Sequence, residues 1–215
     1  MKHYLCLLLA LALHTIPCLA AEKQAQDLIV TFVSGSVTFT NQSATGPVQK
    51  GQLLKPGDIL VTDADGYVDF GLETNHRFRL NPKSRATVVE ASKMTPLPNS
   101  LETSTRLALD QGSLLAEVKK LSVFGKFEIT TPVNLVAIRG TSFYLHADGT
   151  CRVMSGQVLS IFKTPNQTTT VFTGQTVESP APGTSPVSKP TPKDIARKLE
   201  SDFKDAAAHR IPKKR

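Results

Sequence analysis

The sequence predicts an all-β protein: a twisted two-layer β-roll or sandwich of short strands and hairpins, followed by a C-terminal linker and one short amphipathic helix. Two observations support this fold class. In YVDFGL, residues 67–72, and KFEIT, residues 126–130, every second residue is a large apolar one, which is typical of strands with one buried face. In LIVTFV, residues 28–33, and NLVAI, residues 134–138, consecutive apolar residues indicate strands covered on both faces, and therefore two packed layers.

The first 21 residues have the layout of a secretory signal peptide. A basic start precedes an apolar run from Leu5 to Leu13, and Pro17 and two small residues, Ala20 and Ala21, follow. This run is much shorter than the ~20 residues that span a bilayer. We therefore expect cleavage and a periplasmic or secreted chain, with an uncleaved anchor as the alternative. Lipidation of Cys18 is not expected, because Pro17 stands where a lipoprotein site has a small residue.

Charge and cysteine content narrow the function classes. The formal net charge is +7, but residues 22–188 hold 15 basic and 14 acidic side chains, whereas residues 189–215 hold nine basic and four acidic ones. Such a nearly neutral body has no electrostatic footprint for nucleic acid. Only Cys151 remains beyond the signal segment. We expect its thiol to be buried as a small hydrophobe, with an intermolecular bridge as the alternative.

Two copies of Ala-Asp-Gly, residues 64–66 and 147–149, lie between predicted strands. Asp-Gly suits a tight turn, so both copies are predicted to be hairpin turns. Around the first copy, Asp63, Asp65 and Asp69 match positions one, three and seven of a calcium loop. The positions that need Gly and Glu in such a loop hold Val68 and Thr74 instead, and a turn is therefore favoured over a calcium site.

A weak internal repeat runs through the chain. Three strands open with glycine, in SGSVTFT from Ser34, QGSLLAEV from Gln111 and SGQVLSIF from Ser155. The first and third are followed by the similar pieces VQKGQLL, ending at Leu54, and VFTGQTV, ending at Val177. The pattern predicts stacked hairpins or a twisted β-roll. The alternative is that glycine merely punctuates the strands of a β protein.

An ordered series of motifs resembles the FecR domain family, named for the ferric-citrate regulator. The resemblance extends from about residue 28 to residue 178, with a polar, proline-containing insert at residues 92–104 as a departure. A strand, a Thr-Pro pair, an apolar run into Gly-Thr-x-Phe and a further Gly-initiated strand are its most specific part. The positions taken as the family's structural motif are Gly51, Gly57, Asp58, Thr131, Pro132, Gly140, Thr141, Phe143 and Gly156. At Gly140 we expect a turn that only glycine allows.

The resemblance implies an exported β domain that takes part in signalling. In the namesake regulators a cytoplasmic segment controls a sigma factor, one transmembrane helix follows, and the exported part receives a signal from an outer-membrane transporter. Here a signal peptide takes the place of the cytoplasmic segment, and neither a later span nor a second folded module is recognisable. Classical anti-sigma activity is therefore not expected.

After residues 22–178, the expected FecR-like domain, the chain has a Pro-rich linker at residues 179–190 and a basic helix and tail at residues 191–215. Thr191 is predicted to cap the helix, with Pro192 at its first position. Its apolar face is Ile195, Leu199, Phe203 and Ala207. One interpretation is a helix that docks loosely on its own domain or frays. The other, which adds His209 to Arg215, is a tether to an acidic partner, anionic lipid or cell-wall polymer.

Residues that could carry catalysis are sparse. Beyond the signal segment the histidines are His76, His146 and His209, and they lack the spacing of metal ligands. No nucleophile elbow, phosphate loop or dinucleotide fingerprint is present. We assign no catalytic, cofactor-binding or metal-binding residues and expect no enzymatic activity. A hydrolase with two distant carboxylates is the enzymatic alternative.

The sequence thus predicts an exported, non-catalytic binding or sensing module of the bacterial envelope, accessory to envelope signalling. Its expected partner is an envelope protein or a cell-wall polymer, and not nucleic acid. The alternative is a structural envelope protein that its basic tail tethers to the cell wall or an anionic surface.

Overall fold

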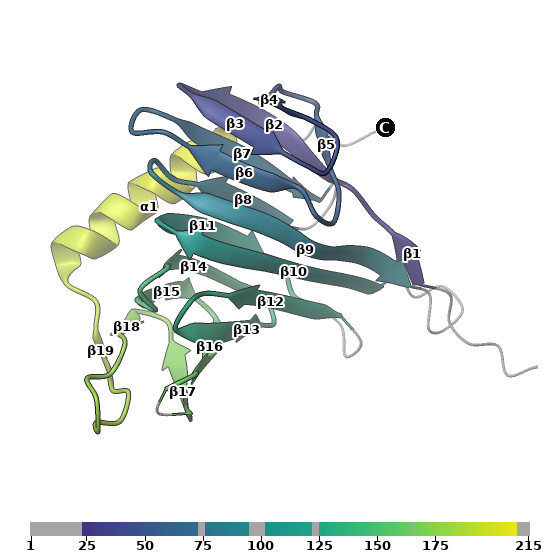
Figure 1. Cartoon of the computed structure of the whole chain (residues 1–215). Helices are drawn as coiled ribbons and strands as arrows, with labels where there is room; N and C mark the ends of the chain where they lie inside the picture. Colours follow the sequence, from purple (N-terminus) through teal and green to yellow (C-terminus); the bar gives the residue numbers. More distant parts are fainter. Residues whose placement is uncertain (1–22, 73–75, 95–101, 122–124, 165, 210–215) are drawn as a thin grey trace, which may run out of the picture.

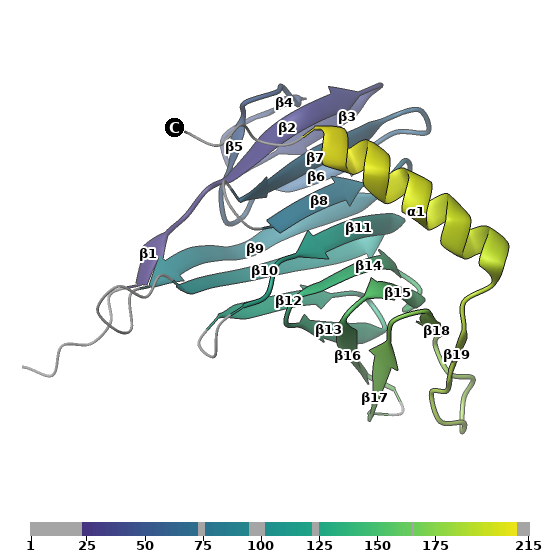
Figure 2. The same cartoon turned by 180° about the vertical axis from the view of Figure 1, so that it is seen from behind.

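The computed structural model describes residues 23–72, 76–94, 102–121, 125–164 and 166–209. These residues form 19 strands and one helix. The strands make two sheets packed face to face, and the helix crosses the outer face of one sheet (Figures 1 and 2). The predicted fold class, an all-β two-layer sandwich with one C-terminal helix, is confirmed. The signal peptide expected at residues 1–21 and most of the insert at 92–104 lie outside the described residues.

Sheet A holds the strands whose outer face is uncovered. In spatial order they are β17 (Gln167–Phe172), β16 (Gln157–Phe162), β13 (Asn134–Ile138), β12 (Lys126–Thr130), β10 (Glu102–Gln111), β9 (Arg85–Met94), β6 (Ile59–Thr62), β3 (Val37–Thr40) and β4 (Thr45–Pro47), with β1 (Lys23–Ala25) paired to β9. Neighbours run antiparallel except β10 and β12, which are parallel.

Sheet B lies beneath the helix. Its spatial order is β19 (Ser188–Pro190), β18 (Gln175–Val177), β15 (Cys151–Ser155), β14 (Thr141–His146), β11 (Ser113–Val118), β8 (His76–Leu80), β7 (Tyr67–Leu72), β2 (Leu28–Ser34) and β5 (Leu53–Leu54). The helix α1 (Lys193–Ala208) runs back across this sheet from the side of β15 towards β2 (Figure 2). Within the part of the chain that the structure describes, no helix has the length and apolar character of a membrane span.

Consecutive strands or hairpins alternate between the two sheets. Thus β7 and β8 pair in sheet B, β9 and β10 pair in sheet A, and the hairpins β12–β13, β14–β15 and β16–β17 continue the alternation. Apart from β1, β4 and β5, spatial order along both sheets therefore follows chain order, and the chain turns a corner at each crossing between the sheets.

The two ends of the sandwich repeat one arrangement. In β2 to β5 and in β15 to β18, the outer two strands pair in sheet B while the inner two pair in sheet A. Glycines occupy matching corners: the amide of Gly51 donates to the carbonyl of Val30, and that of Gly174 to the carbonyl of Val153, both at 2.8 Å. The repeat seen between the first and third glycine-initiated strands is therefore structural. The second differs, because Gly112 leads from sheet A to sheet B.

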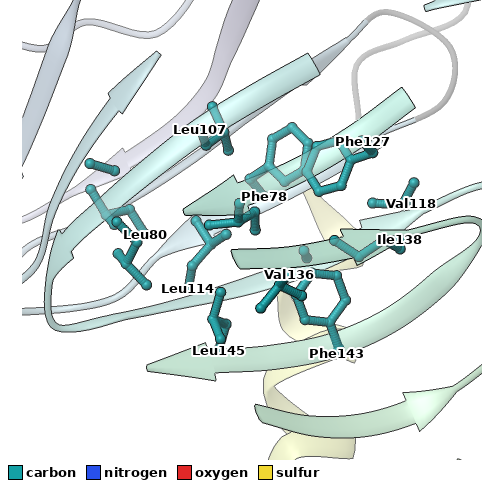
Figure 3. Close-up of a cluster of buried hydrophobic side chains, with 14 of the residues drawn as sticks. Phe78, Leu80, Leu107, Leu114, Val118, Phe127, Val136, Ile138, Phe143 and Leu145 are labelled. Carbon is teal, nitrogen blue, oxygen red and sulfur yellow. The ribbon is translucent and has the colours of Figure 1, made fainter. Parts of the chain in front are cut away.

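The hydrophobic core fills the space between the sheets. Its largest fully buried side chains include five phenylalanines: Phe70, Phe78, Phe127, Phe143 and Phe162. The ring of Phe78 stacks on Phe127 with centroids 5.3 Å apart (Figure 3). Strands of both sheets supply this continuous cluster, and no residue of α1 belongs to it. The sandwich core is therefore complete without the helix.

One of the two predicted hairpin turns is wrong. Residues 147–149 do join the paired strands β14 and β15, with Gly149 at φ 91°. Residues 64–66 instead lead from β6 in sheet A to β7 in sheet B, which do not pair. A Cβ on Gly66 would lie 2.1 Å from the carbonyl oxygen of Ser36, so this glycine serves a close approach at a corner.

The apolar runs expected to be covered on both faces are buried on one face only. In β13, Asn134, Val136 and Ile138 are buried, whereas Leu135 and Ala137 are half-buried on the outer face of sheet A. In β2 the outward side chains are likewise half-buried, although α1 ends beside them. In these two strands, consecutive apolar residues therefore correspond to one buried face and one half-buried outer face, and not to two covered faces.

The start of α1 also differs from the prediction. The residue at the N-cap is Pro192, and no side chain caps the helix. Thr191 instead completes the strand pairing before it: its hydroxyl lies 2.9 Å from that of Thr176, and its amide donates to the carbonyl of Gly174 at 2.8 Å. The last three residues of the segment expected to be linker, Ser188–Pro190, pair with β18 as strand β19. This pairing brings the helix to the edge of sheet B.

Candidate functional site

The outer face of sheet B under α1 is the candidate functional site. Strand alternation in β8 directs Phe78 and Leu80 into the core and turns Arg77 and Arg79 outwards. The strand register places Asp69 of β7 beside Arg79 and Glu117 of β11 beside Arg77. Both arginines are therefore paired across strands with acids on the same face.

Asp69 and Arg79 form a buried, two-pronged ion pair. Arg79 Nε donates to Asp69 Oδ1 at 2.6 Å and Nη2 donates to Oδ2 at 2.7 Å. The side chains of Arg79 and Asp69 are only 8% and 5% exposed. The guanidinium also lies over the ring of Tyr67, 4.4 Å from its centroid. Such fork-to-fork geometry, with a π face beneath, holds the arginine in one orientation.

The C-terminal end of α1 closes this ion pair from above. Asp205 Oδ2 accepts a hydrogen bond from Arg79 Nη1 at 2.5 Å. His209 Nδ1 lies 2.6 Å from Asp69 Oδ2, and since the carboxylate only accepts, Nδ1 is the donor. The imidazole stacks on Phe32 of β2, with ring centroids 3.7 Å apart and planes 2° from parallel. One residue just beyond α1 thus contacts both β2 and β7.

The electrostatics of the cluster favour charged Arg79. Burial lowers the pKa of Arg79, but its hydrogen bonds to Asp69 and Asp205 and their negative charges outweigh burial, so that this pKa lies above its usual value. At the same end of the helix, Arg77 pairs with Glu117 and donates through Nη1 to the carbonyl of Ala207 at 3.5 Å. An arginine at the carbonyl end of a helix is also favourable for the helix dipole.

The apolar contact of α1 is thin. Leu199 is the one helix residue that is buried within the described chain, and Phe203, Ala206 and Ala207 are half-buried. A cavity of about 20 Å³, room for about one water, remains beside these three residues over β7 and β8. The helix therefore docks on its own domain, as one interpretation of its sequence held, and charged contacts fix its C-terminal end.

Open grooves flank the helix on both sides. The larger, about 570 Å³, lies between α1 residues that include Asp194, Lys198 and Asp202 and sheet B residues that include Tyr144 and Arg152. The guanidinium of Arg152 lies 5.2 Å from the centroid of the Tyr144 ring. The smaller groove, about 330 Å³, lies beside Phe203 on the other flank. The helix thus covers the middle of the face and leaves its margins open.

The residues taken as the family motif lie elsewhere, mostly at corners between the sheets. Gly51 and Gly57 have positive φ at the corners on either side of β5, and Asp58 accepts a hydrogen bond from the amide of Lys55 at 2.9 Å. Phe143 belongs to the core. None of these four residues contributes a side chain to the face under α1.

Three other motif residues meet at one corner. Gly140 and Thr141 lead from β13 to β14, and a Cβ on Gly156 would lie 2.5 Å from the carbonyl oxygen of Gly140. The hydroxyl of Thr141 donates to the carbonyl of Gln157 at 2.7 Å. The structure therefore brings this corner and the start of β16 into close contact.

Thr131 and Pro132 form the turn between β12 and β13. The hydroxyl of Thr131 donates to Asn134 Oδ1 at 2.6 Å, and Asn134 Nδ2 donates to Ser160 Oγ at 2.9 Å. Lys163 Nζ donates to the Pro132 carbonyl at 3.3 Å. Asn134, which sequence analysis did not single out, is completely buried and links this turn to β16.

The cluster of residues at the end of α1 was not predicted from the sequence. Asp69 was noted only as part of a failed calcium pattern, and His209 was assigned to a tail directed at a partner. The structure instead places the His209 ring on Phe32 and Asp69 of the same chain. The only signal was an outward Asp in one strand and an outward Arg in the next, and these become partners only once the register is known.

Two further positions bear on chemistry. The thiol of Cys151 is completely buried in the core, and this burial raises its pKa to about 12. Within the described ranges, no three His, Cys, Asp or Glu side chains gather where they could hold a metal ion.

Comparison with known proteins places this geometry in context. The sequence model of the FecR protein family matches residues 58–159. Two crystal structures of a candidate anti-sigma factor from Parabacteroides distasonis ATCC 8503 are similar in fold, with TM-scores of 0.50 and 0.48 and sequence identities of 13% and 14%. The matches cover 67% and 66% of this chain and 64% and 62% of theirs, so the chain spans less than two thirds of the length of these structures. No curated protein matches the chain.

Proposed function

Residues 58–159 of this chain form a FecR domain, and from that premise we propose that the protein is an exported, non-catalytic binding or sensing module of the bacterial envelope, accessory to signalling. The match from the start of β6 into β16 is the observation that carries the proposal. The similarity in fold to a candidate anti-sigma factor supports a regulatory role.

The polar side chains of the motif and of the cluster at α1 are engaged in structural contacts, which supports a non-catalytic role. The motif residues serve corners and turns through hydrogen bonds to backbone, as Thr141 does with Gln157. The two carboxylates at the end of α1, Asp69 and Asp205, both accept hydrogen bonds from Arg79. This arrangement suits an ion pair and not the separate acid and base of a glycoside hydrolase.

The proposed partner is an envelope protein or a cell-wall polymer, and not nucleic acid. The body of the domain is nearly neutral, so binding to it has to come from shape and specific polar contacts. The protein would then act by binding a partner on one of its exposed surfaces and signalling the bound state through protein contacts.

Capture from the envelope tests this proposal. The chain from residue 22, tagged at its N-terminus so that α1 is undisturbed, is incubated with a fractionated envelope of the source cell and washed at moderate salt. We expect one enriched protein or polymer, which excess untagged chain displaces. No such enrichment, or an equal one with the heat-unfolded chain, would contradict the proposal.

The competing function, a structural protein tethered by its basic tail, needs a matched deletion. A cut before residue 189 would remove β19 and α1 as well, and His209 belongs to the docked cluster. The chain should therefore end at His209, which removes only residues 210–215, four of them basic. Salt-sensitive retention that disappears with this deletion would favour the tether, because such attraction is screened by salt.

A further inference from the structure

The face of sheet B under α1 has the chemistry of a helix-binding groove. Three arginines, Arg77 and Arg79 of β8 and Arg152 of β15, line the grooves or the small cavity around α1, together with the aromatic rings of Tyr67 and Tyr144. The face's own acids, Asp69 and Glu117, are paired with Arg79 and Arg77. Within the described residues Arg152 makes no ion pair, and its Nε is buried without a hydrogen-bond partner. The face therefore keeps capacity for a further carboxylate.

Helix α1 shows what kind of occupant this face accepts. It combines an apolar stripe, Leu199 and Phe203, with acids at Asp194, Asp202 and Asp205. Asp205 pairs with Arg79, and Asp194 and Asp202 line the larger groove with Arg152. An amphipathic helix laid on a complementary face is a recurring mode of peptide recognition. Here the complementarity consists of carboxylates beside an apolar stripe that face arginines on tyrosine rings.

The fit of α1 is incomplete. The helix leaves grooves of about 570 Å³ and 330 Å³ along its sides and places two alanines, Ala206 and Ala207, over the cavity of about 20 Å³. A helix with larger apolar residues at these places, and a carboxylate that reaches Arg152, would bury more surface and satisfy one more charge.

The helix can also leave without unfolding the domain. No residue of α1 belongs to the continuous core between the sheets. The segment before it, residues 181–185, is exposed. A single helix of 16 residues is marginal by itself and depends on its docked face. Local opening of α1 therefore requires less free energy than global unfolding.

We propose that this face of sheet B is a docking surface for an amphipathic helix of a partner protein, with carboxylates beside its apolar stripe, and that α1 occupies the surface until the partner displaces it. The proposal rests on the proposed function and specifies its partner as a protein helix instead of a polymer. Because α1 competes within the same chain, the partner's apparent affinity is reduced by the fraction of molecules that are open.

Peptide binding to the full chain tests the proposal. The probe is a fluorescent synthetic peptide with the length of α1 that keeps the residue types found at 194, 195, 199, 202, 203 and 205 and has Ala, Gln or Lys elsewhere. Its control replaces the three Asp residues with Asn. The chain is compared with a Leu199→Ala, Asp205→Ala variant, which loosens α1 and leaves sheet B unchanged. Amide exchange confirms that α1 opens while the core strands stay protected.

We expect the Asp peptide to bind the loosened variant at least tenfold more tightly than the unaltered chain, and the Asn peptide to bind it at least tenfold less tightly than the Asp peptide. Equal affinities for the two peptides, or for the two chains, would overturn the proposal, as would no binding at all. If the loosened variant fails to fold, a Phe203→Ala variant takes its place with the same expectations.

This experiment separates the inference from the proposed function. Peptide binding that follows the expected order, without any envelope protein captured, would leave the docking surface standing and contradict the envelope role. Capture of a partner from the envelope, with no peptide binding to the loosened chain, would support the envelope role and reject this surface.

Discussion

At the scale of single residues, the pair Asp69 and Arg79 shows how the domain keeps charges under a helix. Removing two ions from water is unfavourable unless hydrogen bonds compensate for the lost hydration. Here the guanidinium donates to both oxygens of Asp69 and to Asp205, and it lies over Tyr67. The pair is therefore saturated, and each partner depends on the other.

Replacing Asp69 with Ala should destabilise the protein by about 3 kcal/mol, because the buried guanidinium would keep only the carboxylate of Asp205. The matched control is Asp205→Ala, whose side chain is 56% exposed and whose loss should lower the free energy of unfolding by less than about 1 kcal/mol. Urea unfolding of both variants measures the difference. If both variants lost the same free energy of unfolding, Asp205 would stabilise the buried Arg79 as much as Asp69 does.

Cys151 supplies a pH-dependent contribution to stability. Its folded-state pKa is raised from 9.0 to about 12 by burial, so its contribution is complete below pH 9 and is lost between pH 9 and pH 12 as the unfolded chain ionises first. At pH 10 the unaltered chain should lose about 1.4 kcal/mol relative to pH 8.

The check for Cys151 is a difference measurement. Urea unfolding of the chain from residue 22 and of its Cys151→Ala variant is compared at pH 8 and pH 10, so that lysine and tyrosine titration cancels. The Ala variant should not show this loss. An identical pH dependence in the two chains would show that the thiol ionises as readily in the fold as in the unfolded chain.

How far single residues could be predicted depended on whether their role is local. Cys151 in a strand after a turn was expected to be a buried hydrophobe, and it is. The partners of Asp69 could not be inferred, because Arg79 is brought to it by strand register and His209 by a contact across 140 positions of the chain. Register between strands is set by the complete set of side chains on a face, and short motifs do not report it.

At the scale of elements, the corners between sheets are the most constrained segments. Gly140 has φ 100°, and a Cβ there would lie 2.8 Å from Cα of Lys120. Gly57 has almost the same backbone angle, φ 98°, but nothing within 4 Å of its Cβ position. These two corners separate the effect of backbone conformation from the effect of crowding.

Gly57→Ala should therefore destabilise the protein by about 1–2 kcal/mol, through the backbone conformation alone. Gly140→Ala should add a further ~1–3 kcal/mol, because the backbone at Lys120 has to shift. Thermal or urea unfolding of the two alanine variants gives both values. If Gly140→Ala were no worse than Gly57→Ala, the close approach to Lys120 would have no energetic weight.

The sequence predicted the type of each element better than it predicted how the elements are connected. The period of two identified the strands, and the glycine spacing of the first and third repeats identified matching corners. The Asp-Gly pair at 65–66 was misassigned because the same dipeptide suits a hairpin and a corner between layers. The start of α1 was placed one residue early because Thr191 is engaged with Thr176 in strand pairing, a contact that local capping rules do not include.

At the scale of the whole molecule, the sandwich is larger than the segment that the FecR family model matches. The FecR match covers residues 58–159, but the core also contains Leu28, Val30 and Leu54 before it and Phe162, Val171 and Val177 after it. Within sheet B the match omits β2, which pairs with β7. The matched segment is thus the middle part of one continuous core.

A fragment of residues 58–159 should therefore fail to unfold cooperatively, because it lacks core side chains at both ends and exposes new strand edges. Residues 22–190 keep the complete core and should unfold in a single cooperative transition without α1. Far-UV circular dichroism with urea, together with near-UV circular dichroism, distinguishes the two fragments. Cooperative unfolding of the short fragment would show that the flanking strands are accessory.

The path of α1 has a consequence for how the molecule is completed during synthesis. Because spatial order follows chain order from β6 onwards, each later strand or hairpin that emerges from the ribosome finds an earlier neighbour to pair with. The helix follows all the described strands in the chain, starts beside the most recent of them and places His209 against Phe32 of β2, one of the earliest. It can dock only when every strand between these two ends has taken its position. A docked α1 therefore indicates a fully assembled sandwich, and a displaced α1 leaves its docking face on sheet B open.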